Sequence, residues 1–134
     1  MTTRLHGILP VLQIPFHDQA GLTIVDEAAL RREVEFCLAC GAHGLVVPAL
    51  ASEFMVLTDE ERRRVVEVVA EQAAGRVPVV ANVAAASVNA AVAFAAHASE
   101  VGAAAVMALP PYIRKPAADG VVAYYRAIAD AAAL

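Results

Sequence analysis

The feature that most constrains this fold is a strand followed by a helix, repeated four times at roughly thirty-residue intervals. Each repeat opens with a short apolar run, and residues at helical spacing follow it. The four apolar runs are residues 7–16, 44–50, 77–83 and 103–109. Such a repeat predicts a parallel sheet joined by right-handed crossovers.

Start and stop signals divide the four helices from the strands. A helix is expected from Asp26, after a turn at residues 17–21, and Gly41 stops it. Thr58 and the carboxylate three residues later form a capping box for the second helix, which we expect to end at Gly75. Ser87 is the expected cap of the third helix. The expected buried faces are Ala91, Phe94, Ala95 and Ala98 in the third helix and Val121, Tyr125, Ile128 and Ala132 in the fourth.

Two architectures fit this repeat, an open doubly wound sheet and part of a (β/α)8 barrel. A nucleotide-binding sheet normally has a glycine-rich turn after its first strand, and none follows Phe16. A barrel takes about 250 residues, so four units make about half of one. We therefore predict an α/β fold of the TIM-barrel class, with residues 1–134 as a single amino-terminal half-barrel segment.

Composition excludes several classes of partner. A formal net charge of −4 argues against a binder of nucleic acid. Residues 77–99 carry no formal charge and are long enough to span a bilayer, but Pro78, Asn82 and His97 interrupt them, so no membrane segment is expected. No cationic leader opens the chain, which favours a cytoplasmic protein.

The cysteines and histidines do not form a metal pattern. Cys37 and Cys40 make a single C-x-x-C without the two further ligands that structural zinc needs. We interpret them as buried thiols in a reducing compartment. The four histidines are not at ligand spacing, so no metal is expected.

Several short sequence motifs occur in the same order as in a known family. They are "GAHGLVV", a glutamate at position 53 before "LTDEER", then "GRVPVVANV", "PPYIRKP" and "GVVAYYRAIADA". In this order the chain resembles the dihydrodipicolinate synthase and N-acetylneuraminate lyase family of class I aldolases. The resemblance covers essentially the whole chain.

The resemblance implies a homo-oligomeric (β/α)8 barrel that acts on pyruvate or another 2-keto acid without a metal or organic cofactor. A lysine of the sixth strand forms a Schiff base with the keto group, because a protonated imine withdraws electrons better than a ketone. Lys115 is the only lysine here and lies in a proline-flanked loop. The chain alone is therefore expected to be inactive. The alternative is a non-catalytic half-barrel that self-associates, because its two sheet edges are unpaired.

The family's second strand ends in a Gly-Thr-Thr-Gly-Glu type motif, which corresponds here to residues 49–53. The resemblance makes Ala51, Ser52 and Glu53 substrate-binding candidates, with backbone amides around the substrate carboxylate. The Ser52 hydroxyl either adds a bond or is small enough for the turn to close. Glu53 is expected to accept bonds from the loop backbone. Leu50 replaces a family hydroxyl, so a proton relay through this position is excluded.

Two further candidates follow the third and fourth strands. Asn82 either faces the substrate or caps the next turn, and Tyr112 either lines the barrel mouth or packs on the loop. The family's second tyrosine corresponds to Ile113. Because two relay groups are missing, a divergent member using another 2-keto acid fits better than dihydrodipicolinate synthase itself. The stretch "ERRRVVE" is interpreted as an exposed basic edge, with Glu60 and Arg64 as an ion pair.

Overall fold

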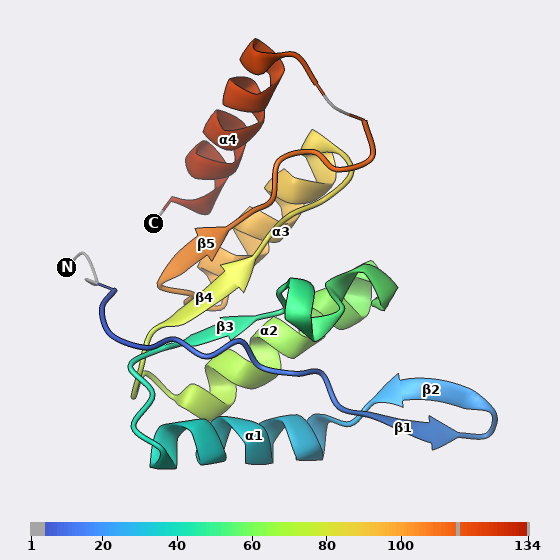
Figure 1. Cartoon of the computed structure of the whole chain (residues 1–134), viewed down its shortest axis with the longest axis vertical. Helices are drawn as coiled ribbons and strands as arrows, with labels where there is room; N and C mark the ends of the chain where they lie inside the picture. Colours follow the sequence, from blue (N-terminus) through green and yellow to red (C-terminus); the bar gives the residue numbers. More distant parts are fainter. Residues whose placement is uncertain (1–4, 115, 134) are drawn as a thin grey trace.

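The computed structural model describes residues 5–114 and 116–133. It contains the four strand–helix units that the sequence predicts, arranged side by side (Figure 1). The expectation for Lys115 falls outside the described residues. Among those residues, no helix is long and apolar enough to cross a membrane.

A three-stranded parallel sheet forms the centre of the molecule. Its strands are β3 (Leu45–Val47), β4 (Val79–Asn82) and β5 (Ala105–Met107), adjacent in that order. The register places Leu45 opposite Val79, and Val80 opposite Ala105. All three arrows in Figure 1 point the same way, so the three following loops leave from one edge.

The predicted first strand is an extended segment beside β3. Leu12 N donates to Val46 O at 3.0 Å, and Val46 N donates to Pro10 O at 3.0 Å, which makes one parallel bridge between Val11 and Val46. Pro10 and Pro15 have no N–H to donate, so a longer ladder cannot form. The segment therefore takes the place of a first strand without regular pairing.

A β-hairpin replaces the simple turn expected at residues 17–21. β1 (Phe16–Gln19) and β2 (Leu22–Val25) pair antiparallel and project from the body of the molecule (Figure 1). Ala20 and Gly21 join them with φ of 54° and 83°. Positive φ at both central residues is the geometry of a tight hairpin turn, which follows the twist of the strands.

The described residues form four α-helices, of which the second and third begin at the predicted caps Thr58 and Ser87. They are α1 (Glu27–Ala39), α2 (Asp59–Ala73), α3 (Val88–Glu100) and α4 (Ala118–Ala132). Asp26 accepts from Ala29 N, and Ser87 accepts from Ala90 N. Thr58 and Glu61 form the full capping box, since each side chain accepts from the other residue's backbone N–H.

The helices cover one face of the sheet, and the main core lies between the helices and the sheet. Leu45, Val47, Val79 and Ala81 point into this core. Alternate residues of the same strands, Val46 and Val80, form a small apolar cluster on the other face. A sheet that is apolar on both faces is typical of a barrel wall.

The buried face of α3 is the predicted one, whereas that of α4 differs from the prediction. Tyr124, Ile128 and Ala132 are buried, whereas Tyr125 is 39% exposed. Tyr124 and Tyr125 are neighbours, and both are compatible with the helical period. Tyr124 takes the buried place because its hydroxyl accepts a hydrogen bond from the buried Ala85 N–H at 3.2 Å.

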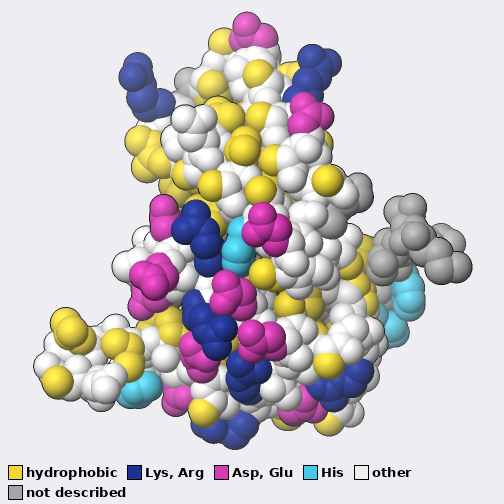
Figure 2. Space-filling model, turned by 180° about the vertical axis from the view of Figure 1, so that it is seen from behind, with side chains coloured by type: hydrophobic (Ala, Val, Ile, Leu, Met, Phe, Trp, Pro, Cys, Tyr) yellow, Lys and Arg dark blue, Asp and Glu magenta, His cyan; other side chains and the backbone are white. Residues whose placement is uncertain are grey.

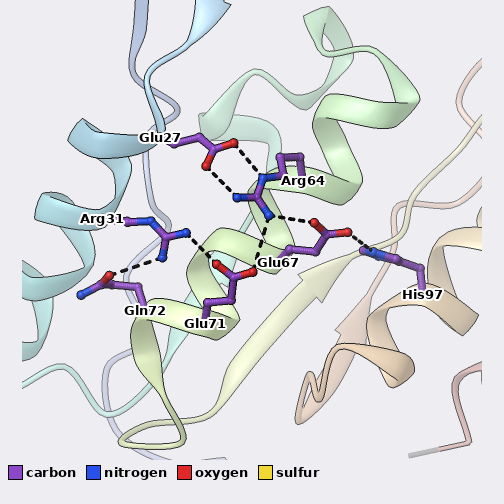
Figure 3. A network of polar contacts seen from close by, with 7 residues as sticks. All are labelled: Glu27, Arg31, Arg64, Glu67, Glu71, Gln72 and His97. Carbon is purple, nitrogen blue, oxygen red and sulfur yellow. Dashed lines mark hydrogen bonds and ion pairs between the residues drawn. The ribbon is translucent and has the colours of Figure 1, made fainter.

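A polar network ties the helices together on the outer face. Figure 2 shows acidic and basic side chains gathered there, and Figure 3 shows the seven residues of the network, which include the neutral Gln72, at close range. Arg64 donates to both carboxylate oxygens of Glu27 at 2.7 and 2.8 Å and to Glu67 at 3.0 Å. His97 contacts Glu67 at 3.0 Å. Arg64 thus joins α1 to α2, and the predicted pair with Glu60 is wrong.

This network shifts the acidity of its carboxylates. The hydrogen bond from Arg64 lowers the pKa of Glu27, and the contact with His97, followed by that with Arg64, lowers the pKa of Glu67. The Arg64 and Glu27 side chains are each 40% exposed, so water screens the pair and its contribution to stability is small.

The two cysteines differ in burial. Cys37 is half-buried, and burial raises the pKa of its thiol. Cys40 is exposed, so the prediction of two buried thiols is wrong for this residue. Cys40 is the C-cap of α1, where the helix ends at the surface.

Candidate functional site

The predicted site residues lie in the loops at the carboxyl edge of the sheet. Ala51, Ser52 and Glu53 follow β3, Asn82 ends β4, and Tyr112 follows β5. Parallel strands present their carboxyl ends at the same edge, which is where barrel enzymes carry their sites. Side-chain contacts connect all three loops, as the following paragraphs describe.

The loop after β3 is a tight turn that the side chain of Ser52 holds in place by hydrogen bonds. Ala49 is extended, and a 3-10 helix from Leu50 to Ser52 follows it. The Ser52 hydroxyl accepts from Ala49 N at 3.0 Å and donates to Leu12 O. Ser52 is 2% exposed, and its one proton is committed to Leu12, so in this arrangement its hydroxyl cannot donate to a ligand. Ser52 closes the turn and ties it to the first extended segment.

Two backbone amides at the top of this loop are unpaired. The N–H groups of Ser52 and Glu53 donate to Ala49 O at 3.1 Å and Leu50 O at 3.0 Å. The N–H groups of Leu50 and Ala51 donate to no acceptor in the part of the chain that the structure describes. The first donors of a helical turn have no partner within the turn. They are therefore available to an acceptor from outside the loop.

Glu53 has a left-handed backbone and an exposed side chain. Its φ is 56° and its ψ is 38°, a conformation that lets the chain turn from one short 3-10 helix (η1, Leu50–Ser52) into the next (η2, Phe54–Val56). Within residues 5–114 and 116–133 its carboxylate accepts no hydrogen bond from the loop, contrary to expectation. It borders a hollow of about 440 Å³ between the hairpin and the start of α2, beside Thr23 and Thr58.

Asn82 is buried at the end of β4 and turns the chain there. Its side-chain Oδ1 accepts from Ala84 N at 3.2 Å, and the residue is 5% exposed. The capping interpretation is thus the one that matches the contacts. Asn82 shapes the segment from residue 82 to residue 85 rather than pointing a free amide into the open.

Tyr112 packs on the loop and remains partly exposed. Its ring meets the Phe54 ring edge to face, with centroids 6.1 Å apart, and the residue is 37% exposed. The contact brings the loop after β5 against the loop after β3. The packing interpretation of Tyr112 therefore has direct geometric support, and its exposed part lies at the rim.

The sequence interpretation missed Arg62, which it placed on an exposed basic edge. Arg62 is 6% exposed, and its guanidinium carbon lies 4.8 Å from the Phe54 ring centroid and 4.0 Å from that of Phe94. A signal was present, because Arg62 shares the helical period of the buried Val65, Val66 and Val69. Its position within a run of charges hid this pattern.

None of the described residues form a group of three or more His, Cys, Asp and Glu side chains that could hold a metal ion. The loops at the carboxyl edge carry backbone amides, the exposed Glu53 carboxylate and the Tyr112 hydroxyl, and the buried Arg62 guanidinium lies behind them. Unpaired backbone N–H donors are a chemistry suited to an anion. None of them is a nucleophile toward a carbonyl.

Comparison with known proteins identifies the family. Residues 4–134 match the Dihydrodipicolinate synthetase family. The chain is 43% identical over 128 residues to a 4-hydroxy-tetrahydrodipicolinate synthase of Phenylobacterium zucineum, covering 96% of this chain and 42% of that relative. The chain therefore belongs to the Dihydrodipicolinate synthetase family.

Solved structures agree with this assignment. A crystal structure of dihydrodipicolinate synthase from Aquifex aeolicus superimposes with a TM-score of 0.88 at 32% identity, covering 95% of this chain and 42% of that one. The N-acetylneuraminate lyase of Mycoplasma synoviae gives a TM-score of 0.86 at 25% identity, covering 93% of this chain and 43% of that one. The fold is that of the first four units of a (β/α)8 barrel. The chain spans less than half the length of the relatives that it matches.

Proposed function

We propose that this chain is the amino-terminal part of a Schiff-base lyase that acts on pyruvate or another 2-keto acid. In this proposal residues 1–134 form one half-barrel segment whose loop after β3 holds the substrate carboxylate. The supporting observation is the pair of unpartnered amides of Leu50 and Ala51, adjacent in a rigid turn at the carboxyl edge.

A carboxylate offers two oxygens, and two adjacent N–H groups can bind it without a charged side chain. The Ser52 hydroxyl holds the turn by its hydrogen bonds with Leu12 O and Ala49 N, so the amides are in place before the ligand arrives. Pre-organised donors do not have to be reoriented on binding, which favours affinity. In this proposal the anchored carboxylate fixes the position of the neighbouring keto carbon.

The chemical step requires a lysine that the family resemblance places on a later strand. Its amine attacks the keto carbon and water leaves, giving an iminium that draws electrons from the adjacent carbon. A carbon–carbon bond to that carbon can then break and leave its electron pair there, or that carbon can lose a proton while an oxygen leaving group departs from the next carbon. This chain contributes binding and orientation, and the lysine comes from the remainder of the barrel.

The rim favours a keto acid that does not need the family's hydroxyl relay. Leu50 and Ile113 stand where the resemblance expects a hydroxyl and a second tyrosine, and they are 60% and 69% exposed. Neither side chain can move a proton. Proton transfer must therefore come from other strands or from solvent, which argues for a divergent substrate rather than that of the synthases.

Removing a single amide tests the carboxylate site. Leu50 is the first residue of the 3-10 helix and follows the extended Ala49, a context in which proline is tolerated. Leu50→Pro deletes the N–H, whereas Leu50→Ala keeps it and serves as the matched control. We expect pyruvate to shift the NMR resonance of the Ala51 amide in the wild type and in Leu50→Ala, with affinity about tenfold lower in Leu50→Pro. Equal affinity in the two variants would refute the amide site.

The isolated chain should not form the covalent intermediate. Incubation with pyruvate and borohydride is expected to give no mass increase, because the lysine that forms the imine is not part of this segment. A reduced adduct on Lys115, the only lysine here, would show that the segment is catalytic by itself.

The second candidate is a non-catalytic half-barrel that pairs with another copy. The outer edge of β5 pairs with no other strand in the described part of the chain, and unpaired edges promote association. A discrete even-numbered oligomer in light scattering supports this alternative, and a monomer argues against it. Under both proposals we place the protein in the cytoplasm and expect it to form a homo-oligomer.

A further inference from the structure

Arg62 is the only buried charged residue in the part of the chain that the structure describes. Its guanidinium lies between the rings of Phe54 and Phe94, with centroids 4.8 and 4.0 Å from its central carbon. The two rings come from different elements, since Phe54 follows β3 and Phe94 belongs to α3. Arg62 itself lies in the first turns of α2, directly behind the carboxyl edge.

The guanidinium is bonded to the segment that follows β4. Its terminal nitrogen Nη2 donates to Ala84 O at 2.8 Å and to Asn82 O at 3.3 Å. Two further hydrogen bonds hold the same segment. Ala84 N donates to Asn82 Oδ1, and Ala85 N donates to the Tyr124 hydroxyl of α4.

The Phe54 contact extends this arrangement to a third loop. Phe54 lies against Arg62 on one side and meets the Tyr112 ring on the other. One side chain thus contacts the loop after β3, bonds the loop after β4 and reaches the loop after β5 through a single ring. These are the three loops that carry the candidate site.

Burial of this cation is unfavourable for the stability of the fold. Burial lowers the pKa of Arg62, and within the described residues no carboxylate forms an ion pair with it. Its Nε is buried and has no hydrogen-bond acceptor in the same set of residues. An unpaired buried donor costs free energy, and apolar replacements of buried charges are often neutral or stabilising. If position 62 only had to fill space in the core, an apolar side chain would pack there equally well.

We propose that Arg62 is a positioning residue that sets the geometry of the carboxyl-edge loops. It holds the backbone at Asn82 and Ala84 and the Phe54 ring in one arrangement, at a cost to overall stability. The loops are then ordered before a ligand binds. This inference rests on the proposed function only in taking this edge as the binding edge, and its principal test needs no ligand.

Hydrogen exchange in Arg62→Met separates positioning from packing. Methionine keeps the volume and the apolar stem but removes the donors and the charge. We expect the Ala84 and Ala85 amides to exchange at least about tenfold faster, because a hydrogen bond from a charged donor is worth more than one factor of ten. The urea midpoint and the exchange of Val69 in the centre of α2 should stay unchanged or improve.

Two further variants complete the experiment. Arg63→Met is the matched control, since Arg63 lies 5.1 Å from the Phe94 ring but bonds none of the described residues of the three loops. It should leave the Ala84 and Ala85 amides unaffected. Arg62→Lys restores one charged donor and should give an intermediate exchange rate. Near-ultraviolet circular dichroism should lose tyrosine signal in Arg62→Met only, as Phe54 and Tyr112 are released from each other.

The inference fails if Ala84 and Ala85 exchange at the wild-type rate in Arg62→Met. It also fails if every amide exchanges faster together and the urea midpoint falls, since Arg62 would then be an ordinary core residue. Wild-type protein titrated with pyruvate tests the proposed function separately. If the Leu50 and Ala51 amides do not respond while the exchange result holds, the binding proposal fails and the positioning role stands.

Discussion

The Phe54 and Tyr112 rings meet edge to face, with centroids 6.1 Å apart and planes inclined at 82°. Phe54 follows the first strand of the regular sheet and Tyr112 follows the last. The contact therefore spans the width of the sheet at its carboxyl edge. It shows that loops from separate strand–helix units pack together there, which is what a shared binding edge requires.

Loss of the Tyr124 hydroxyl should destabilise the chain, because it would leave a buried donor unpaired. Tyr124 is fully buried and accepts from Ala85 N, and Ala85 is itself buried. We expect Tyr124→Phe to lower the free energy of unfolding by about 1–3 kcal/mol, measured by urea denaturation.

The neighbouring tyrosine provides the control. Tyr125 is exposed, and its hydroxyl donates to Ala108 O at 3.0 Å. Water can replace this bond, so Tyr125→Phe should cost less than about 1 kcal/mol. If Tyr124→Phe and Tyr125→Phe lower the free energy of unfolding equally, the buried hydrogen bond of Tyr124 stabilises the fold no more than the exposed bond of Tyr125 does.

Lowering the pH should destabilise the packing of the helices, because it protonates the carboxylates of Glu27 and Glu67. Both carboxylates have a pKa lowered below the ordinary value of 4.5, so the ionised form is favoured in the folded state. Their stabilisation is therefore present above about pH 4.5 and is lost as pH falls through the lowered values. The free energy of unfolding should therefore fall as the pH is lowered below about 4.5.

The variant Arg64→Gln should reduce this pH dependence, because Arg64 bonds both carboxylates. We expect a loss of about 1 kcal/mol or less near pH 6, as the pairs are partly exposed, and a smaller loss near pH 3. Arg32→Gln on the exposed side of α1 is the control, since Arg32 has no ion pair within the described ranges. A parallel downward shift at both pH values for Arg64→Gln would contradict the assignment.

The capping box of α2 makes a separate prediction. Thr58→Ala removes the hydroxyl that accepts from Glu61 N and should cost about 1 kcal/mol in a denaturant titration. Thr58→Ser keeps the hydroxyl and should retain most of that stability. Because α2 carries Arg62, fraying at Thr58 should also speed the exchange of the Ala84 amide.

The strand–helix order could be predicted from sequence because its signals are local. The apolar runs and the caps Thr58 and Ser87 each act within one turn of chain, and both caps form the expected bonds. The hairpin was missed because Ala20 adopts a positive φ that alanine rarely takes. A glycine or asparagine at that position would have indicated the tight turn.

The site was harder to predict because its contacts are not local. The residue types at 51–53, 82 and 112 indicated the carboxyl edge of the sheet, where the structure places them, but not which of their groups are already hydrogen-bonded. Ser52 donates to Leu12, far away in sequence, and Arg62 reaches across to Ala84. No periodic pattern reveals such bonds. Charge suggested that Arg62 was exposed, whereas the aromatic rings on both sides of it account for its burial.

A map of every backbone amide during a pyruvate titration examines the binding edge most directly, with acetone as the ligand that lacks a carboxylate. The account predicts that NMR shifts concentrate at residues 49–53, with smaller changes at 82–85 and 110–114, and that acetone produces none at Leu50 or Ala51. Shifts centred instead on the opposite edge, around Arg76 and Gly102, would contradict it.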